Sequence, residues 1–224
     1  MTPEEQIAHI NKVNEQLITL MGSLVETRNL ESRGHIKRMR AFTHILATEL
    51  MNRFPEYGLD RNKVNIMVAA SALHDMGKIM ISDSILFKPA RLTREEFDIM
   101  KTHTTLGCEM LNNISEVWDE EFHKAAYDIC RSHHEKYDGK GYPDGLVGDD
   151  IPISAQIVSI ADIFDALVCV KLYKDAYTPE QAYKMIVSGE CGTFNPKLME
   201  CFKNCADQFE LVARKSREDE ARWE

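Results

Sequence analysis

Apolar side chains recur along most of this chain at steps of three and four residues, the period of an amphipathic α-helix. No run of alternating β-branched residues competes with that period, so we predict an all-α fold. The pattern places helices over residues 3–28, from Ser32 to Phe54, over 61–76, from Thr93 through His103, over 120–135 and over 153–170. A capping residue followed by proline starts the last two predicted helices, at Thr178-Pro179 and Asn195-Pro196.

Local signals support several of these boundaries. Gly77 is a C-terminal glycine after the third predicted helix, and Thr93 begins a capping box that starts the fourth. Residues 79–92 lack a helical pattern and are predicted to form a long loop. The stretch 137–152 contains four glycines and two prolines and is predicted to consist of turns.

Two predicted helices show an apolar face clearly. The second carries His35, Met39, Phe42, Leu46 and Leu50 on one face. The first carries a seam of about two heptads, which consists of Ile10, Val13, Leu17, Leu20 and Leu24. The seam indicates either a signalling or dimerisation helix, as in a homodimer, or a helix packed on its own domain. We assign residues 1–27 to this amphipathic helix, 28–205 to the main domain and 206–224 to a charged C-terminal helix end or tail.

Composition narrows the classes of function. The chain has 224 residues, with 27 Lys and Arg against 36 Asp and Glu, a formal net charge of −9 at pH 7. Such a chain lacks the clustered cations that neutralise nucleic-acid phosphates, so we expect no DNA or RNA polymer as partner. No apolar run approaches the roughly 18 residues of a membrane span, and the N-terminus lacks the pattern of a signal peptide, so we expect a cytoplasmic protein without membrane contact. The six cysteines contain no Cys-x-x-Cys pair and are expected to be reduced thiols.

Eight histidines stand out in this acidic chain, and one of them lies directly beside an aspartate, in His74-Asp75. Adjacent helical residues project about 100° apart, so both side chains reach one metal site only where the helix turns or ends. Gly77 supplies such an end. Four other helical segments carry the remaining candidates, which are His35, His103, His133, His134 and Asp162.

This distribution is typical of a metal site in the core of a helical bundle, to which each helix contributes one or two inward ligands. Five histidines and two aspartates suit two ions rather than one. Imidazole and carboxylate ligands without thiolate favour iron or manganese over a structural zinc. Two such ions activate a bridging water for attack on phosphorus, so the residues alone predict a two-metal hydrolase.

One long motif carries a family resemblance: residues 133–143 read His-His-Glu-Lys-Tyr-Asp-Gly-Lys-Gly-Tyr-Pro. In register with His74-Asp75, Lys78 and the other candidate ligands, this motif resembles the HD-GYP subgroup of the HD-domain metal-dependent phosphohydrolases. The resemblance spans about residues 25–205, and the strings at 82–89 and 161–167 agree with it. It implies a multi-helix HD-domain bundle with the metal site in the helical core.

The resemblance also implies an activity, the hydrolysis of the bacterial second messenger cyclic di-GMP to linear pGpG and on to GMP. The implied cofactors are two or three divalent ions, iron or manganese, held by His35, His74, Asp75, His103, His133, His134 and Asp162. The implied catalytic residues are Asp75 and Lys78, and Lys78 would contact a substrate phosphate or the charge that builds up at phosphorus. In one subset of the family a glutamate at the position of Glu31 helps to hold a third metal; a solvated first-turn glutamate is the alternative.

Further contacts follow from the same resemblance. Substrate or a protein partner such as a diguanylate cyclase would contact the loop of Gly141, Tyr142 and Pro143. Gly139 and Gly141 permit backbone geometries that other residues avoid, and a purely structural turn is the alternative for this loop. Many relatives carry Arg and Lys where this chain has Lys171 and Lys174. Lys171 keeps the charge but lacks the bidentate fork of arginine, which leaves nucleobase specificity open.

Several alternatives stay open at this point. The substrate is cyclic di-GMP, another cyclic dinucleotide or a nucleotide. A non-catalytic signalling module would bind cyclic di-GMP or a protein partner through the first helix and the Gly-Tyr-Pro loop. Helical di-iron sites of the HD type also support oxygen chemistry, although no feature of this sequence specifically indicates it.

Overall fold

The structure, a computed structural model, describes residues 1–29, 34–169 and 176–221. Within these ranges the chain forms helices and no β-strand, which confirms the predicted all-α fold. The α-helices are α1 (Pro3–Asn29), α2 (His35–Arg53), α3 (Arg61–Ala70), α4 (Asp83–Leu86), α5 (Arg94–Lys101), α6 (His103–Asn112), α7 (Glu120–Ser132), α8 (Ile153–Val168), α9 (Pro179–Val187), α10 (Pro196–Asn204) and α11 (Ala206–Ala221). Short 3-10 helices span Pro55–Tyr57, Ser71–Leu73, Met76–Met80, Ser115–Val117 and Gly148–Asp150.

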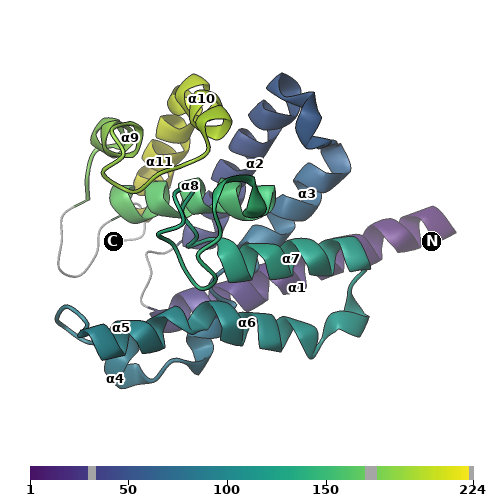
Figure 1. Ribbon diagram of the computed structural model, residues 1–224. Helices are drawn as coiled ribbons and strands as arrows, with labels where there is room; N and C mark the ends of the chain where they lie inside the picture. Colours follow the sequence, from purple (N-terminus) through teal and green to yellow (C-terminus); the bar gives the residue numbers. More distant parts are fainter. Residues whose placement is uncertain (30–33, 170–175, 222–224) are drawn as a thin grey trace.

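Helices α2 and α8 form the centre of the bundle. Helix α2 packs against α3, α8, α10 and α11, and α8 packs against α7 and α9 as well. In Figure 1, α5 and α6 lie along the lower edge, with α7 between them and α8, while α9, α10 and α11 lie above α8. The metal-site candidates therefore come from helices that meet around α8.

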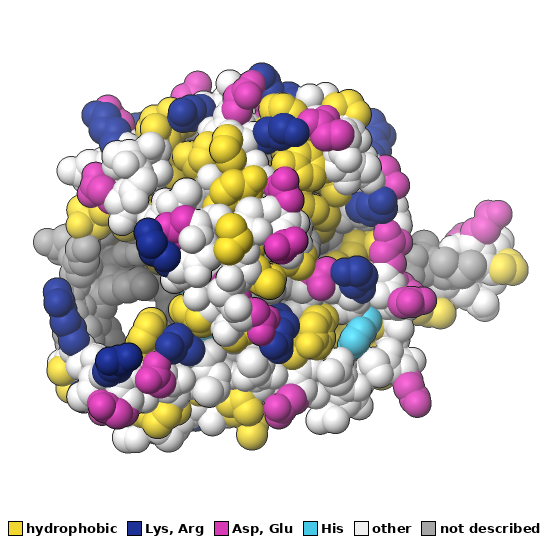
Figure 2. Space-filling model, in the orientation of Figure 1, with side chains coloured by type: hydrophobic (Ala, Val, Ile, Leu, Met, Phe, Trp, Pro, Cys, Tyr) yellow, Lys and Arg dark blue, Asp and Glu magenta, His cyan; other side chains and the backbone are white. Residues whose placement is uncertain are grey.

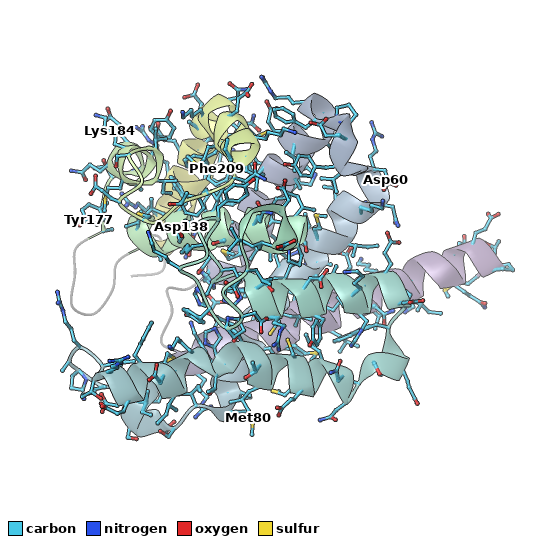
Figure 3. The ribbon with its side chains drawn as sticks, viewed as in Figure 1. Asp60, Met80, Asp138, Tyr177, Lys184 and Phe209 are labelled. Carbon is cyan, nitrogen blue, oxygen red and sulfur yellow. The ribbon has the colours of Figure 1, made fainter. Side chains whose placement is uncertain are left out.

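An aromatic cluster holds the upper layer to the centre. The ring of Phe42 on α2 stacks on Phe209 of α11 with centroids 4.7 Å apart, and it meets the edge of Phe164 on α8 at 5.2 Å. Phe209, labelled in Figure 3, is fully buried where α8, α10 and α11 meet. Helix α11 is thus part of the same hydrophobic core as residues 28–205. The face predicted for α2 is also buried throughout.

Helix α1 packs on the domain, but not through its predicted seam. The seam residues Ile10, Val13, Leu17, Leu20 and Leu24 are 37–60% exposed. The opposite face is buried instead, through Ile18 and Val25, and a Cβ on Gly22 would lie 2.5 Å from the carbonyl oxygen of Ala72. The helix does pack on its own domain, as one of the two interpretations has it, but through the face around Gly22 and not through the seam. The dimerisation or signalling role of the seam stays a prediction.

Two predicted helices are interrupted. The helix predicted over 61–76 ends as an α-helix at Ala70 and continues as the 3-10 turn Ser71–Leu73. The helix that starts at Thr93 ends at Lys101, so His103 is the first residue of α6 instead of lying on the second or third turn. The hydroxyls of Thr102 and Thr104 donate to the carbonyls of Ile99 and Lys101 at 2.6 and 2.9 Å. Such side-chain bonds compete with regular helical bonds, which explains the break.

Other predicted boundaries shift by a few residues. The helices predicted over 120–135 and 153–170 end at Ser132 and Val168. Residues 79–92, predicted as a loop, contain the end of a 3-10 helix and the short helix α4. In the described part of the chain, none of the helices has the length and apolar character needed to cross a bilayer.

Candidate metal centre

The predicted ligands come from five helical segments and meet in two groups. His35 begins α2, His74 and Asp75 follow the 3-10 turn after α3, His103 begins α6, His133 and His134 follow α7, and Asp162 lies within α8. One group consists of Asp75, His103, His133 and His134, and the other of His35, His74 and Asp162. In each group the candidate ligand atoms lie within 4.8 Å of one another. All seven residues proposed from the sequence are thus brought together.

The carboxylate of Asp75 lies between the two groups. Its Oδ1 is 3.3 Å from Nε2 of His103 and 3.6 Å from Nε2 of His133. Its Oδ2 is 3.4 Å from Nε2 of His74, which in turn lies 3.8 Å from Oδ1 of Asp162. One oxygen of Asp75 therefore faces each group, so this carboxylate would contribute a ligand atom to an ion held by either group.

The chain folds at Gly77 so that adjacent residues reach one centre. Asp75 has φ −101° and ψ 12°, between two 3-10 segments, so His74 and Asp75 leave the regular helix before their side chains diverge. Gly77 is not in the left-handed region expected of a C-terminal glycine. A Cβ on Gly77 would lie 1.9 Å from the carbonyl oxygen of His103, so glycine is needed there for close packing against α6.

The imidazoles are oriented by their outer nitrogens. The Nδ1 atoms of His74, His103 and His133 lie 2.9, 2.7 and 3.0 Å from the main-chain carbonyls of Ser71, Met100 and Ile129. A carbonyl only accepts hydrogen bonds, so each Nδ1 carries the proton and donates it. Each Nε2 then presents a lone pair toward the centre, which is the form that binds a metal.

These atoms fit divalent cations. Asp75 Oδ1, His103 Nε2 and His133 Nε2 are buried and have no hydrogen-bond partner within the described residues. Lone pairs of nitrogen and carboxylate oxygen face each other across 3.3 and 3.6 Å, an arrangement that is costly unless a cation lies between them. Imidazole and carboxylate donors suit iron, manganese or another borderline divalent ion.

Burial and neighbouring charges shift the titration of these groups. Burial lowers the pKa of His133, and burial together with the imidazoles of His133 and His103 lowers that of His134 well below the ordinary 6.5. Burial acts to raise the pKa of Asp75, but Lys78 and the facing imidazoles outweigh it and hold that pKa well below its ordinary value. His133 and His134 are therefore neutral, and Asp75 is charged, near neutral pH.

Lys78 lies at the edge of this centre. Its Nζ pairs with Oδ2 of Asp75, and its side chain is 20% exposed. Arg28 of α1, which sequence reasoning missed, holds the neighbouring segment: it donates to the carbonyl of Ile81 at 2.9 Å and pairs with Asp83 at 2.8 Å. Lys78 itself contacts the carboxylate of Asp75 and is partly exposed to solvent.

The Gly-Tyr-Pro loop is anchored beside the centre by Glu135. The buried carboxylate of Glu135 accepts from the main-chain N–H groups of Asp144, Gly145 and Leu146 at 2.7, 3.0 and 3.1 Å. A Cβ on Gly141 would lie 2.3 Å from Cα of Glu135. Gly141 is therefore required for close approach, whereas Gly139 has the positive φ (78°) that the sequence analysis expects of a glycine in this loop.

Tyr142 brings the loop to the metal centre. Its ring lies 4.7 Å from that of His134, between centroids, and Phe97 of α5 lies 6.0 Å away on another side. Pro143 follows through a cis peptide bond. Gly141, Tyr142 and Pro143 are therefore adjacent to the group of candidate ligands that contains His134.

Comparison with known proteins identifies the family. The family model described as the HD domain matches residues 9–198. The chain belongs to the HD-domain family. This confirms the resemblance on which the sequence analysis relied.

Two relatives of this HD domain have named activities. The 3'3'-cGAMP-specific phosphodiesterase 2 of Vibrio cholerae is 38% identical over 200 residues, which cover 89% of this chain and 36% of that protein. A cyclic di-GMP phosphodiesterase response regulator of Xanthomonas campestris is 35% identical over 209 residues, which cover 92% of this chain and 52% of that protein. The HD domain thus spans about a third to a half of the length of these relatives.

Two solved structures share the fold. A cyclic GMP-AMP specific phosphodiesterase of Vibrio cholerae superposes with a TM-score of 0.58 at 18% identity, covering 86% of this chain and 50% of that chain. An HDG"Y"P protein from Bdellovibrio bacteriovorus superposes with a TM-score of 0.54, also at 18% identity, covering 77% of this chain and 52% of that chain. At this identity the likeness shows the fold of the HD domain.

Three predicted site residues lie outside the described residues: Glu31, Lys171 and Lys174. Two further residues, not assigned from the sequence, join the site: Asp165 contacts His35, and Arg38 contacts Asp165. The spacing of Asp162 and Asp165, three residues apart on one helix, is the sequence signal for the first of these. The face in Figure 2 shows little histidine, in keeping with the burial of the candidate ligands.

The pKa shifts predict how the metal-free HD domain responds to pH. His133 and His134 titrate near 6.5 in the unfolded chain and below it in the folded chain, so below pH 6.5 the unfolded state binds more protons. The contribution of these imidazoles to the free energy of unfolding is therefore fully present above pH 6.5. It falls as the pH drops below 6.5, by about 1.4 kcal/mol per pH unit for each such imidazole. Thermal unfolding of chelator-treated protein between pH 5.5 and 7.5 measures this. A midpoint that does not change over that range would contradict the assigned burial.

A second prediction concerns the anchor of the loop. Glu135→Gln replaces one acceptor oxygen by an NH₂ group that faces main-chain donors. We expect a loss of about 1–3 kcal/mol in unfolding free energy and faster hydrogen exchange at residues 144–146. Glu120→Gln, an exposed change at the start of α7, the helix that precedes Glu135, is the control. Parent-like exchange at residues 144–146 in Glu135→Gln would show that the carboxylate does not hold the loop.

Proposed function

We propose that this HD domain is a metal-dependent phosphodiesterase that hydrolyses cyclic di-GMP to pGpG and on to GMP. The observation that carries the proposal is the pair of ligand groups joined by the carboxylate of Asp75. Two divalent ions, when bound, supply Lewis acidity and an activated water. The named activities of the Vibrio and Xanthomonas relatives support a cyclic dinucleotide as the substrate.

The residues of the chain have separate roles in this proposal. Asp75 holds both ions at a fixed separation, and the six other ligands complete the two groups: His35, His74, His103, His133, His134 and Asp162. Lys78 donates to a non-bridging oxygen of the phosphodiester and stabilises the charge that develops there. Its contact with Asp75 and its partial exposure to solvent support this role.

An aromatic surface beside the centre supports a nucleotide substrate. Tyr142 lies against His134, and Phe97, about half exposed, lies against Tyr142. Aromatic rings stack on nucleobases, with a contribution of about 1–3 kcal/mol per base. Gly141 and Pro143 keep Tyr142 in place, while Lys171 and Lys174 are proposed to contact the second phosphate.

The metals are proposed to be iron or manganese. Glu31 is proposed to hold a third ion, in addition to the two groups. Metal analysis of protein purified without added metal counts the ions, and Glu31→Gln should lower that count by one if the proposal for Glu31 is correct. An unchanged count in Glu31→Gln restricts the centre to two ions.

The direct test uses protein loaded with iron or manganese under anaerobic, reducing conditions. Cyclic di-GMP is added, and pGpG and GMP are followed by chromatography. We expect pGpG first and GMP later. Absence of turnover in protein with its full metal content would refute the proposed activity.

A second substrate, 3'3'-cGAMP, has support of its own. The Vibrio relative named for that substrate is 38% identical to this chain over 89% of its length. Cyclic di-GMP and 3'3'-cGAMP differ in one of their two bases, so the same metal centre serves both. Comparison of kcat/KM for the two cyclic dinucleotides decides between them.

A further inference from the structure

His35 is oriented in a different way from the other imidazoles of the centre. His74, His103 and His133 donate from Nδ1 to main-chain carbonyls, whereas Nδ1 of His35 lies 2.7 Å from Oδ2 of Asp165. Asp165 is 2% exposed and lies on α8, three residues after Asp162. A side chain on another helix, and not the local main chain, therefore orients this candidate ligand.

Arg38 holds Asp165 in turn. Its Nε lies 2.5 Å from Oδ1 of Asp165 and its Nη2 lies 3.2 Å from Oδ2, which is a bidentate arrangement. Both side chains are 3% exposed. The buried carboxylate is thus charged, paired and fixed in position.

Helix α11 extends this network to the C-terminal part of the fold. The Nη1 atom of Arg38 donates to Oγ of Ser216 at 2.9 Å. The next residue, Arg217, donates to the carbonyls of Val168 and Tyr177 at 2.7 and 2.8 Å. Figure 3 labels Tyr177, which lies near the start of α9. Helix α11 therefore contacts the residue that holds Asp165 and also the end of α8.

We propose that Asp165, held by Arg38, is a positioning residue that sets the metal affinity of the group formed by His35, His74 and Asp162. A carboxylate that accepts from Nδ1–H fixes the tautomer and ring orientation of an imidazole and makes its Nε2 more basic. The group formed by Asp75, His103, His133 and His134 lacks this carboxylate in the described structure. The role of Asp165 is therefore specific to an ion held by one of the two groups. This inference rests on the proposed function only in requiring that the centre binds divalent metal.

The experiment is a titration of Mn²⁺ into the chelator-treated full chain, followed by calorimetry and by electron paramagnetic resonance. The parent chain is expected to bind Mn²⁺ in one step for each of the two groups, separately from the third ion proposed at Glu31. Asp165→Asn should weaken one step by about 10- to 100-fold and leave the other unchanged. Asp162→Ala and His134→Ala, which each remove a ligand from a different group, identify which step belongs to which group.

Controls separate positioning from a general loss of structure. Ser159→Ala changes a buried residue six positions before Asp165 on the same helix, and should keep both steps. Arg38→Lys keeps the charge but loses the fork, so it should weaken the same step as Asp165→Asn by a smaller factor. Thermal unfolding of each variant, measured without metal, reports any loss of fold.

Two outcomes would overturn the proposal. Parent-like affinity for both ions in a folded Asp165→Asn variant would show that the carboxylate does not set metal affinity. Equal weakening of both steps would show a structural role for the whole bundle. The titration contains no nucleotide, so it is independent of the proposed substrate, and a parent chain that binds no divalent ion would contradict the metal centre itself.

Discussion

Asp75→Ala is expected to leave less than one ion per chain and to lower the rate of phosphodiester hydrolysis by at least about 10³-fold. The carboxylate of Asp75 faces His74 with one oxygen and His103 and His133 with the other. Its removal therefore takes a ligand from both groups at once. Removal of any one of the imidazoles takes a ligand from one group only, so we expect Asp75→Ala to have the largest effect of the single ligand changes.

Metal analysis and the rate of cyclic di-GMP cleavage are measured on the same preparation. Asp98→Ala is the control, because Asp98 is an exposed aspartate that pairs with Lys101 on α5. It should keep its full metal content. An Asp75→Ala variant that retains two ions with parent affinity would show that the ligand assignment is wrong.

Lys78→Ala is expected to keep both ions and to slow turnover by about 10²- to 10³-fold. The ammonium of Lys78 pairs with Oδ2 of Asp75 and would be a positive charge beside any ion that this carboxylate holds. Loss of that charge removes a repulsion from the ions, so metal affinity should not fall. The rate should fall because the phosphodiester loses the cation that stabilises its developing charge.

Comparison with the parent chain and with Lys88→Ala tests the role of Lys78. Lys88→Ala, which breaks an ion pair with Glu96 near the start of α5, should leave turnover unchanged. If the parent chain binds cyclic di-GMP tightly without hydrolysis and Lys78→Ala binds it equally well, the HD domain is a binding module and not an enzyme. A parallel loss of metal and activity in Lys78→Ala would instead make Lys78 a structural partner of Asp75.

Local sequence signals predict the ends of several helices well because those ends depend on neighbouring residues. The capping box of Thr93 and Glu96 is present in both directions, and so is the box of Thr178 and Gln181. The break before His103 was not predicted. The segment around it has a helical pattern with three threonines, and the sequence does not show which main-chain carbonyls accept hydrogen bonds from their hydroxyls. The bends at Ala70 and Thr102 are the features that bring His74 and His103 to the centre.

The first helix shows the limit of periodicity. A three- and four-residue spacing defines an apolar face, but it does not say which partner covers that face. In the folded domain the seam of α1 is exposed, and the face around Gly22 is the one that contacts Ala72. Those two residues are fifty positions apart in the sequence, so their contact depends on how α1 fits against the rest of the domain. A local sequence pattern does not encode that fit.

The sequence by itself determined the residue types of the centre, the helices that carry them and, through the motif at 133–143, the family. These follow from local periodicity and from the chemistry of imidazole and carboxylate. Only the tertiary structure decided how the ligands divide into two groups, that Asp75 faces both of them, and that Asp165 orients His35 from 130 residues away. The physical reason is that a bridging geometry depends on distances of a few ångströms between separate helices, and packing of the whole bundle sets those distances.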